Sequence, residues 1–382
     1  MKMERTKKWL NERFPFVHIF RHSLEYTVPI NLNAWYIFGS LAILVLLNQF
    51  ITGIWLIFFY TPSASSAFDS IQFIMHDVSY GWLIRYLHTT GASAFLLVIY
   101  LHIFRSLLYG SYKKPRELVW IIGVILFFII LAEAFCGYLL PWGQMSFWGA
   151  QVITSAISAI PLIGESLSTL LRGDFVVSDM TLHRFFALHV VVIPLILLGF
   201  IIFHIKALHH VGSNNPEGTE NVRKIPFHPY YTVKDLLGAA IFLIIFLSIV
   251  FFFPSMGGYF LESANQQPAN ALITPAHIQP MWYMAPFYAI LRAIPNKTGG
   301  IILTSLSVSL LFLLPWLDKS PMRSLRYRRR PSRVALFLFV LSFLGLGYLG
   351  TLEITPIRQY LAQGLTLIYF AFFIFMPFYS KK

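Results

Sequence analysis

The stretch HTTGASAFLLVIYLH, residues 88–102, decides the fold because it is a long apolar run with a histidine at each end. An α-helix turns about 100° and rises about 1.5 Å per residue, so fourteen residues fall about 40° short of four turns. His88 and His102 therefore share one helix face, about 21 Å apart along the axis. That separation predicts one imidazole in each half of a hydrocarbon core about 30 Å thick.

A second apolar run, HVVVIPLILLGFIIFH at 189–204, also begins and ends with histidine. The fifteen-residue spacing of His189 and His204 overshoots four turns by about 60°. A bend at Pro194 would absorb part of this mismatch. The two runs are therefore similar in length, and each has a histidine at both ends.

The second and fourth spans run in the same direction if successive spans alternate across a membrane. His88 then faces His189 near one side, and His102 faces His204 near the other. Opposed imidazoles can serve as axial ligands of haem iron, so the two pairs predict two haems. The alternative is four buried histidines that are satisfied within the protein core. The single cysteine, Cys136, excludes Cys-x-x-Cys-His, so the haems would be bound non-covalently.

The composition indicates an integral membrane protein, since 57% of residues are hydrophobic and only 12% are charged. A span needs about 20 apolar residues, and eight runs are long enough. These runs are 33–59, 81–108, 118–140, 183–208, 233–253, 299–317, 334–350 and 357–378. Two mixed stretches, 142–180 and 262–297, contain Gly, Pro and Ser and are expected to lie on the membrane surface or re-enter it.

We therefore expect an all-α polytopic membrane protein with a four-helix haem bundle in its N-terminal half. Residues 1–32 are basic and amphipathic and predict a surface segment rather than a signal peptide. Residues 33–215 would form the di-haem bundle. Residues 216–382 would form a C-terminal domain with four further spans.

The basic residues predict the orientation of the chain in a membrane. With the N-terminus inside, most lysines and arginines fall in inside segments and at the C-terminus, so both termini are expected to be cytoplasmic. The run RSLRYRRRPSR at 323–333 would attract anionic lipid head groups. It lies between two spans, so it does not indicate nucleic-acid binding.

Glycines and arginines repeat the histidine spacing. Two glycines on the first span and two on the third are also fourteen residues apart, which would let flat macrocycles approach the backbone. The alternative is ordinary glycine-mediated helix packing. An arginine three residues from His88 and another three residues from His102 could pair with haem propionates, although the second could equally be an interface anchor. These candidates are Gly39, Gly53, Gly123, Gly137, Arg85 and Arg105.

Several motifs make the chain resemble the cytochrome b subunits of the cytochrome bc complexes, with the densest match over residues 26–300. The most specific run is PWGQMSFWG. The matching runs are GWLIRYLHTTGAS at 81–93, GYLLPWGQMSFWGAQVI at 137–153, RFFALH at 184–189, GSNNPEG at 212–218, FHPYYTVKD at 227–235 and AILRAIPNK at 289–297.

The resemblance implies a quinol–cytochrome c oxidoreductase that translocates protons by a Q cycle. Quinol would be oxidised at an outer site. One electron would pass to a Rieske iron–sulfur partner and the other through two b haems to an inner quinone-reduction site. A membrane-anchored cytochrome c1, a homodimer of the complex and a bacterial inner-membrane location are also implied. The fifteen-residue histidine spacing is a minor departure that favours a bacterial chain.

The resemblance also assigns residues. His88 and His189 would hold a low-potential outer haem, and His102 and His204 a high-potential inner haem. The inner quinone site would comprise Ser40, His209, Lys234 and Asp235. Of these, His209 and Asp235 can relay protons, although Lys234 and Asp235 could also be a polar pair at a helix start. The outer quinol site would comprise Phe135, Tyr138, Gly149, Pro280, Met281, Trp282 and Tyr283, with Tyr138 and Tyr283 as catalytic residues.

The outer site departs from the family pattern at one position. Where the family usually has Pro-Glu-Trp-Tyr, this chain has Pro-Met-Trp-Tyr, and the thioether of Met281 cannot accept a proton. Glu133 lies within an otherwise apolar span, where a carboxylate is costly and often functional. We hypothesise that Glu133 replaces the missing acid. The alternatives are a structural hydrogen bond at Glu133 and proton transfer through water or Tyr138. Met281 could also mean an attenuated reaction or a different quinone.

Two other functions remain open at this point. A stand-alone di-haem quinone reductase would need fewer spans and neither mixed stretch. A proton-coupled secondary transporter also uses buried histidine, glutamate and broken helices. However, no inverted repeat relates the halves of this chain, and the second half has no comparable histidine pair.

Overall fold

The computed structural model describes residues 2–13 and 26–381. Within these residues, eight helical stretches are long and apolar enough to cross a membrane, which confirms the predicted number. They are η1 with α3 (Ala34–Tyr36 and Phe38–Ile57), α5 (Gly81–Tyr109), α6 (Glu117–Leu139), the continuous run of α9, η2 and α10 (Asp179–Val211), α11 (Tyr230–Phe252), α13 (Lys297–Leu317), α14 (Arg330–Gly350) and α15 (Pro356–Ile374).

Local chemistry explains several helix ends. The Asn296 side chain accepts a hydrogen bond from the Gly299 amide at the start of α13, at 2.8 Å. Such a cap satisfies one of the amides that a helix start leaves unpaired. α5 is followed by Gly110, whose φ of 60° is the left-handed conformation that glycine adopts without strain.

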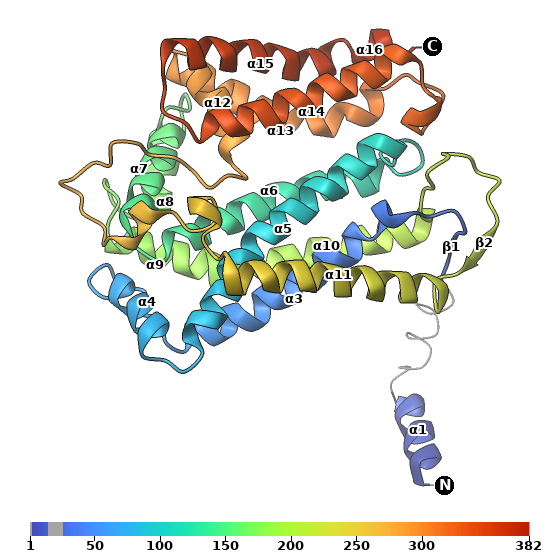
Figure 1. The fold of residues 1–382 in the computed structure, drawn as a ribbon, viewed down its shortest axis with the longest axis horizontal. Helices are drawn as coiled ribbons and strands as arrows, with labels where there is room; N and C mark the ends of the chain where they lie inside the picture. The colour runs from blue at the N-terminus through green and yellow to red at the C-terminus, as the bar shows by residue number, and fades with distance from the viewer. Residues whose placement is uncertain (1, 14–25, 382) are drawn as a thin grey trace.

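The N-terminal half forms a bundle in which α3 lies beside α5, and α6 lies beside α10. Buried apolar side chains from these four helices form the centre of the bundle, including Val45, Phe95, Ile122 and Leu197. Figure 1 shows α13, α14 and α15 together on the side of the bundle nearest α5 and α6. The indole of Trp120 in α6 joins the two halves by donating to the Leu311 carbonyl of α13 at 2.6 Å.

Shorter elements lie at the two ends of the bundle. We call the end that holds His88 the outer end and the end that holds His102 the inner end, following the predicted orientation. The outer end carries α4 (Ala67–His76), α7 (Gln144–Ser158), α8 (Gly164–Arg172), η3 (Met256–Gly258), η4 (Ser263–Gln266) and α12 (Ala285–Ala293).

At the inner end, β1 (Thr27–Pro29) pairs antiparallel with β2 (Lys224–Pro226). η5 (Leu325–Tyr327) and α16 (Met376–Tyr379) lie in the C-terminal half. The predicted N-terminal surface segment contains helix α1 (Lys2–Arg13), and residues 14–25 of that segment lie outside the described residues.

The fourth span absorbs the fifteen-residue histidine spacing differently from the expected bend at Pro194. Residues Leu188–Val192 form a π-helical turn, η2, and Pro194 follows in the first turn of α10. A π-turn inserts one extra residue into a helix. With one residue inserted, fifteen residues on the fourth span turn the helix about as far as fourteen residues do on α5. The π-turn therefore accounts for the longer spacing between His189 and His204.

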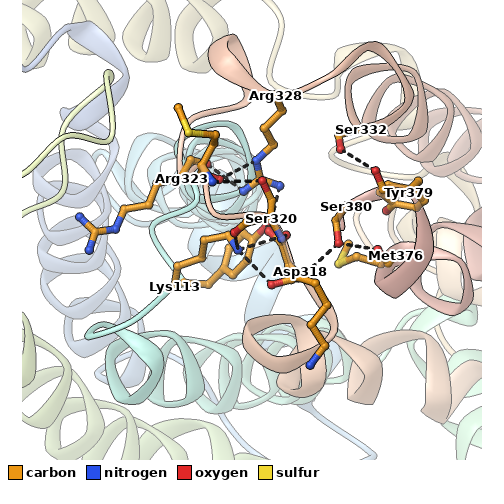
Figure 2. Close-up of polar contacts among 12 residues, drawn as sticks. Lys113, Asp318, Ser320, Arg323, Arg328, Ser332, Met376, Tyr379 and Ser380 are labelled. Carbon is orange, nitrogen blue, oxygen red and sulfur yellow. Dashed lines mark hydrogen bonds and ion pairs between the residues drawn. The ribbon is translucent and has the colours of Figure 1, made fainter. Parts of the chain in front are cut away.

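A buried ionic cluster at the inner end joins the loop after α5 to the loop after α13 (Figure 2). The fully buried Asp318 carboxylate lies 3.1 Å from Lys113 Nζ and 2.8 Å from the Arg328 guanidinium. Tyr112 donates its hydroxyl hydrogen to the same carboxylate at 2.5 Å. Burial raises the pKa of Tyr112, so its hydroxyl stays protonated as a donor. One carboxylate therefore balances two buried cations.

We expect Asp318→Ala to destabilise the protein strongly because it leaves Lys113 and Arg328 buried without their anion. Removing one partner of a buried ion pair costs about 3–5 kcal/mol. The thermal unfolding midpoint of the purified protein should fall accordingly. Glu220→Ala is the matched control, since Glu220 is 78% exposed although it also pairs with an arginine, Arg323, at 2.8 Å. Equal shifts for the two variants would contradict a structural role for the buried cluster.

Candidate functional site

The four histidines form two facing pairs. The ring centres of His88 and His189 are 6.2 Å apart with an interplanar angle of 90°. Those of His102 and His204 are 6.4 Å apart at 62°. These separations leave room for one metal ion between each pair, bound by a nitrogen of each ring at about 2 Å. The rings thus face each other as the helical spacing predicted.

Hydrogen bonds at the outer pair hold one nitrogen of each ring. His88 Nδ1 lies 2.9 Å from Thr52 Oγ1, whose own hydrogen goes to the Asn48 carbonyl. His189 Nδ1 lies 3.1 Å from the Glu133 carbonyl and 3.0 Å from the Glu133 carboxylate. A histidine that ligates a metal commonly donates its second ring nitrogen in this way. Both outer rings therefore have Nε2 left for a metal.

Four glycines each lie directly against one of these rings. A Cβ atom built on each glycine would meet the Cε1 atom of a different histidine. The separations are 3.6 Å for Gly39 and His102, 3.1 Å for Gly53 and His88, 3.2 Å for Gly123 and His204, and 2.5 Å for Gly137 and His189. The glycines thus leave space around each ring that a larger residue would fill.

Arg105 lies one turn beyond His102. Its guanidinium approaches His102 Nδ1 at 3.5 Å and packs over the Tyr36 ring at 4.8 Å. Its Nε atom is buried and has no hydrogen-bond partner among the residues that the structure describes. An unpaired buried guanidinium nitrogen fits a bound anionic group such as a haem propionate. Arg85 lies three residues before His88 on the same helix.

The predicted inner quinone residues are only partly brought together. Ser40 of α3 donates its hydroxyl hydrogen to the Asp235 carboxylate of α11 at 2.6 Å. His209 stacks on Tyr26, with ring centres 4.3 Å apart. Lys234, the neighbour of Asp235, instead extends over the Tyr231 ring at 4.6 Å. Ser40 and Asp235 form the contact at the centre of this candidate site.

The Pro-Met-Trp-Tyr segment packs against the part of α5 that lies between His88 and His102. Trp282 donates its indole hydrogen to Ser93 Oγ at 3.2 Å, and Tyr100 donates to the Tyr283 carbonyl. Tyr283 is 2% exposed, and burial raises the pKa of its hydroxyl. Met281 is partly buried within the apolar core of the bundle.

Two other predicted outer-site residues lie on α6, and one lies on α7. A Cβ on Gly149 would lie 4.0 Å from the Tyr138 ring, so these two residues adjoin each other. Phe135 packs edge-on against Phe185, with ring centres 5.7 Å apart. α6 therefore presents Tyr138 to the outer segments of the chain.

The sequence analysis missed one residue of this region, Glu262. Its carboxylate accepts hydrogen bonds from Tyr138 Oη at 3.1 Å and from Gln279 Nε2 at 2.9 Å. Burial raises the pKa of the Glu262 carboxyl. The sequence contained one signal for it, since Glu262 is the single acidic residue between Asp235 and Asp318.

Comparison with known proteins identifies the family. Residues 23–212 match the model described as cytochrome b/b6/petB, and residues 268–370 match that of cytochrome b (C-terminal)/b6/petD. The chain is 52% identical to cytochrome b of Allochromatium vinosum, over 100% of this chain and 97% of that protein. The chain belongs to the cytochrome b family. Family membership implies b-type haem and a role in electron transfer.

Two more relatives agree with this assignment. Cytochrome b of Rickettsia prowazekii is 49% identical, over 96% of this chain and 92% of the relative. A solved structure described as a hyperthermophilic respiratory complex III contains a chain that is 39% identical, with a TM-score of 0.89 and 98% of both chains covered. The likeness therefore extends over both halves of the protein.

Proposed function

We propose that this cytochrome b is the catalytic membrane subunit of a quinol–cytochrome c oxidoreductase, the activity of respiratory complex III. The observation that carries the proposal is the pair of facing histidine sites at two depths of one bundle, each ring lying against a glycine. The structural likeness to a chain of a complex III supports it.

Two b-type haems fit the residues present. His88 and His189 would ligate a low-potential outer haem, and His102 and His204 a high-potential inner haem. Arg85 and Arg105 would pair with propionates, and the four glycines would keep the ring faces accessible. When bound, the haems would supply the redox centres between the outer and inner quinone sites.

At the outer site, the chain would bind quinol and receive one of its protons. Phe135, Gly149, Pro280, Met281 and Trp282 would form the pocket walls. Tyr138 and Tyr283 would present hydroxyl groups to the quinol. One electron of the pair would leave to the Rieske iron–sulfur partner, which this chain does not contain.

At the inner site, quinone reduction requires a proton at each carbonyl oxygen. The hydrogen bond between Ser40 and Asp235 holds a carboxyl group where it can supply one of them. His209, stacked on Tyr26, would supply the other, and Lys234 would replenish protons from the inner surface. Proton release outside and uptake inside would couple electron transfer to proton translocation, as in a Q cycle.

The proposal includes the partners and location that the sequence predicted. These are the Rieske protein, a membrane-anchored cytochrome c1, and a homodimeric complex in a bacterial inner membrane with both termini cytoplasmic. The division of the chain at residue 215 into a haem-binding and a C-terminal domain belongs to the same proposal.

A redox titration of the purified complex tests this function. Following the reduced b-haem absorption, we expect two components with separate midpoint potentials, together with quinol-dependent reduction of cytochrome c. One component would contradict the two-haem assignment. Absence of haem bands would favour the transporter, and haem reduction by quinol without cytochrome c reduction would favour the stand-alone quinone reductase.

The hypothesis that Glu133 replaces the missing acid stays a prediction, but its contact with His189 adds a second role. We expect Glu133→Gln to raise the midpoint potential of the outer haem, because it removes a negative charge 3.0 Å from the Nδ1 atom of a ligand. The same titration measures this shift. Near-normal quinol oxidation in Glu133→Gln would exclude Glu133 as the substitute acid, and an unchanged potential would exclude the ligand-orienting role.

A further inference from the structure

Hydrogen bonds join the segment after α11, which carries Glu262, to the start of α7. Asn265, three residues further on, accepts a hydrogen bond from the Ser146 amide at 2.9 Å and donates one to the Ser146 hydroxyl at 3.0 Å. The Gln144 amide donates to the Gln267 carbonyl at 3.0 Å. The Asn265 amide also donates to the Glu262 carbonyl at 3.1 Å, so these bonds tie the backbone at Glu262 to α7.

The Glu262 carboxylate bridges two segments that both belong to the outer quinol site. One oxygen accepts from the hydroxyl of Tyr138, the residue of α6 that adjoins Gly149. The other accepts from Gln279, which is two residues before Met281. The acid thus lies beside the segment in which the family's usual carboxylate is replaced by methionine.

The surroundings of Glu262 suit a group that gains and loses a proton. Burial raises the pKa of its carboxyl, while the hydrogen bonds from Gln279 and Tyr138 and the nearby His277 lower that pKa by smaller amounts. His277 also has a buried Nε2 atom without a hydrogen-bond partner among the described residues. Tyr138, Gln279 and His277 are therefore the polar groups that face the carboxylate, and none of them is a second acid.

We propose that Glu262 accepts a proton released by quinol at the outer site, in place of the acid missing from Pro-Met-Trp-Tyr. This inference rests on the proposed function. One quinol O–H proton leaves with the electron that passes to the Rieske partner. The other O–H bond breaks, its proton moves to the Glu262 carboxylate directly or through the Tyr138 hydroxyl, and the second electron leaves by the haem route. The resulting carboxylic acid loses its proton toward His277 and the outer surface, which restores the carboxylate.

On this proposal Glu262, rather than Glu133, takes the place of the missing acid, and Glu133 keeps the role of orienting His189. The Glu133 carboxylate lies against the Nδ1 atom of His189, whereas the Glu262 carboxylate contacts Tyr138 and Gln279. Quinol oxidation should therefore depend on Glu262 more strongly than on Glu133.

Glu262→Gln in the intact complex tests the proposal. We expect the rate of quinol-dependent cytochrome c reduction to fall at least about a hundredfold, the lower end of what a positioned proton acceptor usually contributes. Both haem components should remain in the redox titration, because no haem ligand is touched. Glu165→Gln is the matched control, since Glu165 is an exposed acid in the first turn of α8, and it should retain the full rate.

The pH profile separates proton transfer from a structural role. The rate of the unmodified complex should fall as the pH drops through the raised pKa of Glu262, because the protonated carboxyl cannot accept a proton. In Glu262→Gln this acid limb should be absent, whereas a purely structural role would lower the rate and leave the limb in place. A low rate that retains the limb would therefore overturn the proposal.

A rescue variant completes the test. Adding Met281→Glu to Glu262→Gln returns a carboxylate to the family's usual position. The double variant should oxidise quinol at least about ten times faster than Glu262→Gln alone. Full activity in Glu262→Gln alone would overturn the proposal. An unmodified complex that binds haem and fails to oxidise quinol would instead overturn the proposed function, so the two failures are distinguishable.

Discussion

Alanine in place of His102 is expected to abolish one of the two b-haem components and leave the other intact. The inner pair would lose one of its two axial nitrogens, while the outer pair lies about 21 Å further along α5. His204→Ala should abolish the same component, since its ring faces that of His102 at 6.4 Å. His88→Ala and His189→Ala should both abolish the other component.

The pattern across the four variants is the decisive result, measured by redox titration of the reduced haem absorption. His183→Ala is the matched control, because His183 lies on the same span as His189 but is exposed and pairs with Asp179 at 3.2 Å. It should keep both components. Loss of the same component in His102→Ala and His189→Ala would show that the rings are paired differently from the structure.

The spans and the histidine pairs could be predicted because both follow from helical period and length. Apolar runs long enough to span a membrane, and histidines fourteen or fifteen positions apart within two of them, can be read directly from the sequence. The π-turn at Leu188–Val192 could not be predicted, since one inserted residue leaves the apolar pattern unchanged. The sequence showed the mismatch and a nearby proline, but only the backbone shows where the extra residue is accommodated.

The polar contacts of the candidate sites were less accessible from sequence. Glu262 meets Tyr138 across 124 positions of the chain, and no local pattern encodes a contact of that range. Glu133 was noticed because an acid is conspicuous in an apolar span, but its partner, His189, depends on how α6 packs against the fourth span. Local rules thus identify unusual residues, and packing decides what those residues do.

Gly137→Ala is expected to remove or strongly perturb the outer haem. The added Cβ would lie 2.5 Å from Cε1 of His189, closer than real Cβ atoms approach a neighbour. The ring is held by its hydrogen bonds to Glu133, so it cannot move away without losing them. Overpacking of this kind costs about 1–3 kcal/mol. The outer component should decrease in amplitude or shift in midpoint potential, while the inner component is unchanged.

Gly39→Ala is the matched control at the inner haem, because its Cβ would lie 3.6 Å from His102 Cε1, an ordinary contact distance. We expect the inner component to be retained with little change. The comparison separates two reasons for the glycine repeat. If only Gly137→Ala perturbs its haem, Gly137 makes room for its imidazole ligand. If both substitutions remove their haems equally, the repeat instead makes room for the macrocycles, and the close approach of Gly137 to His189 is not what limits haem binding.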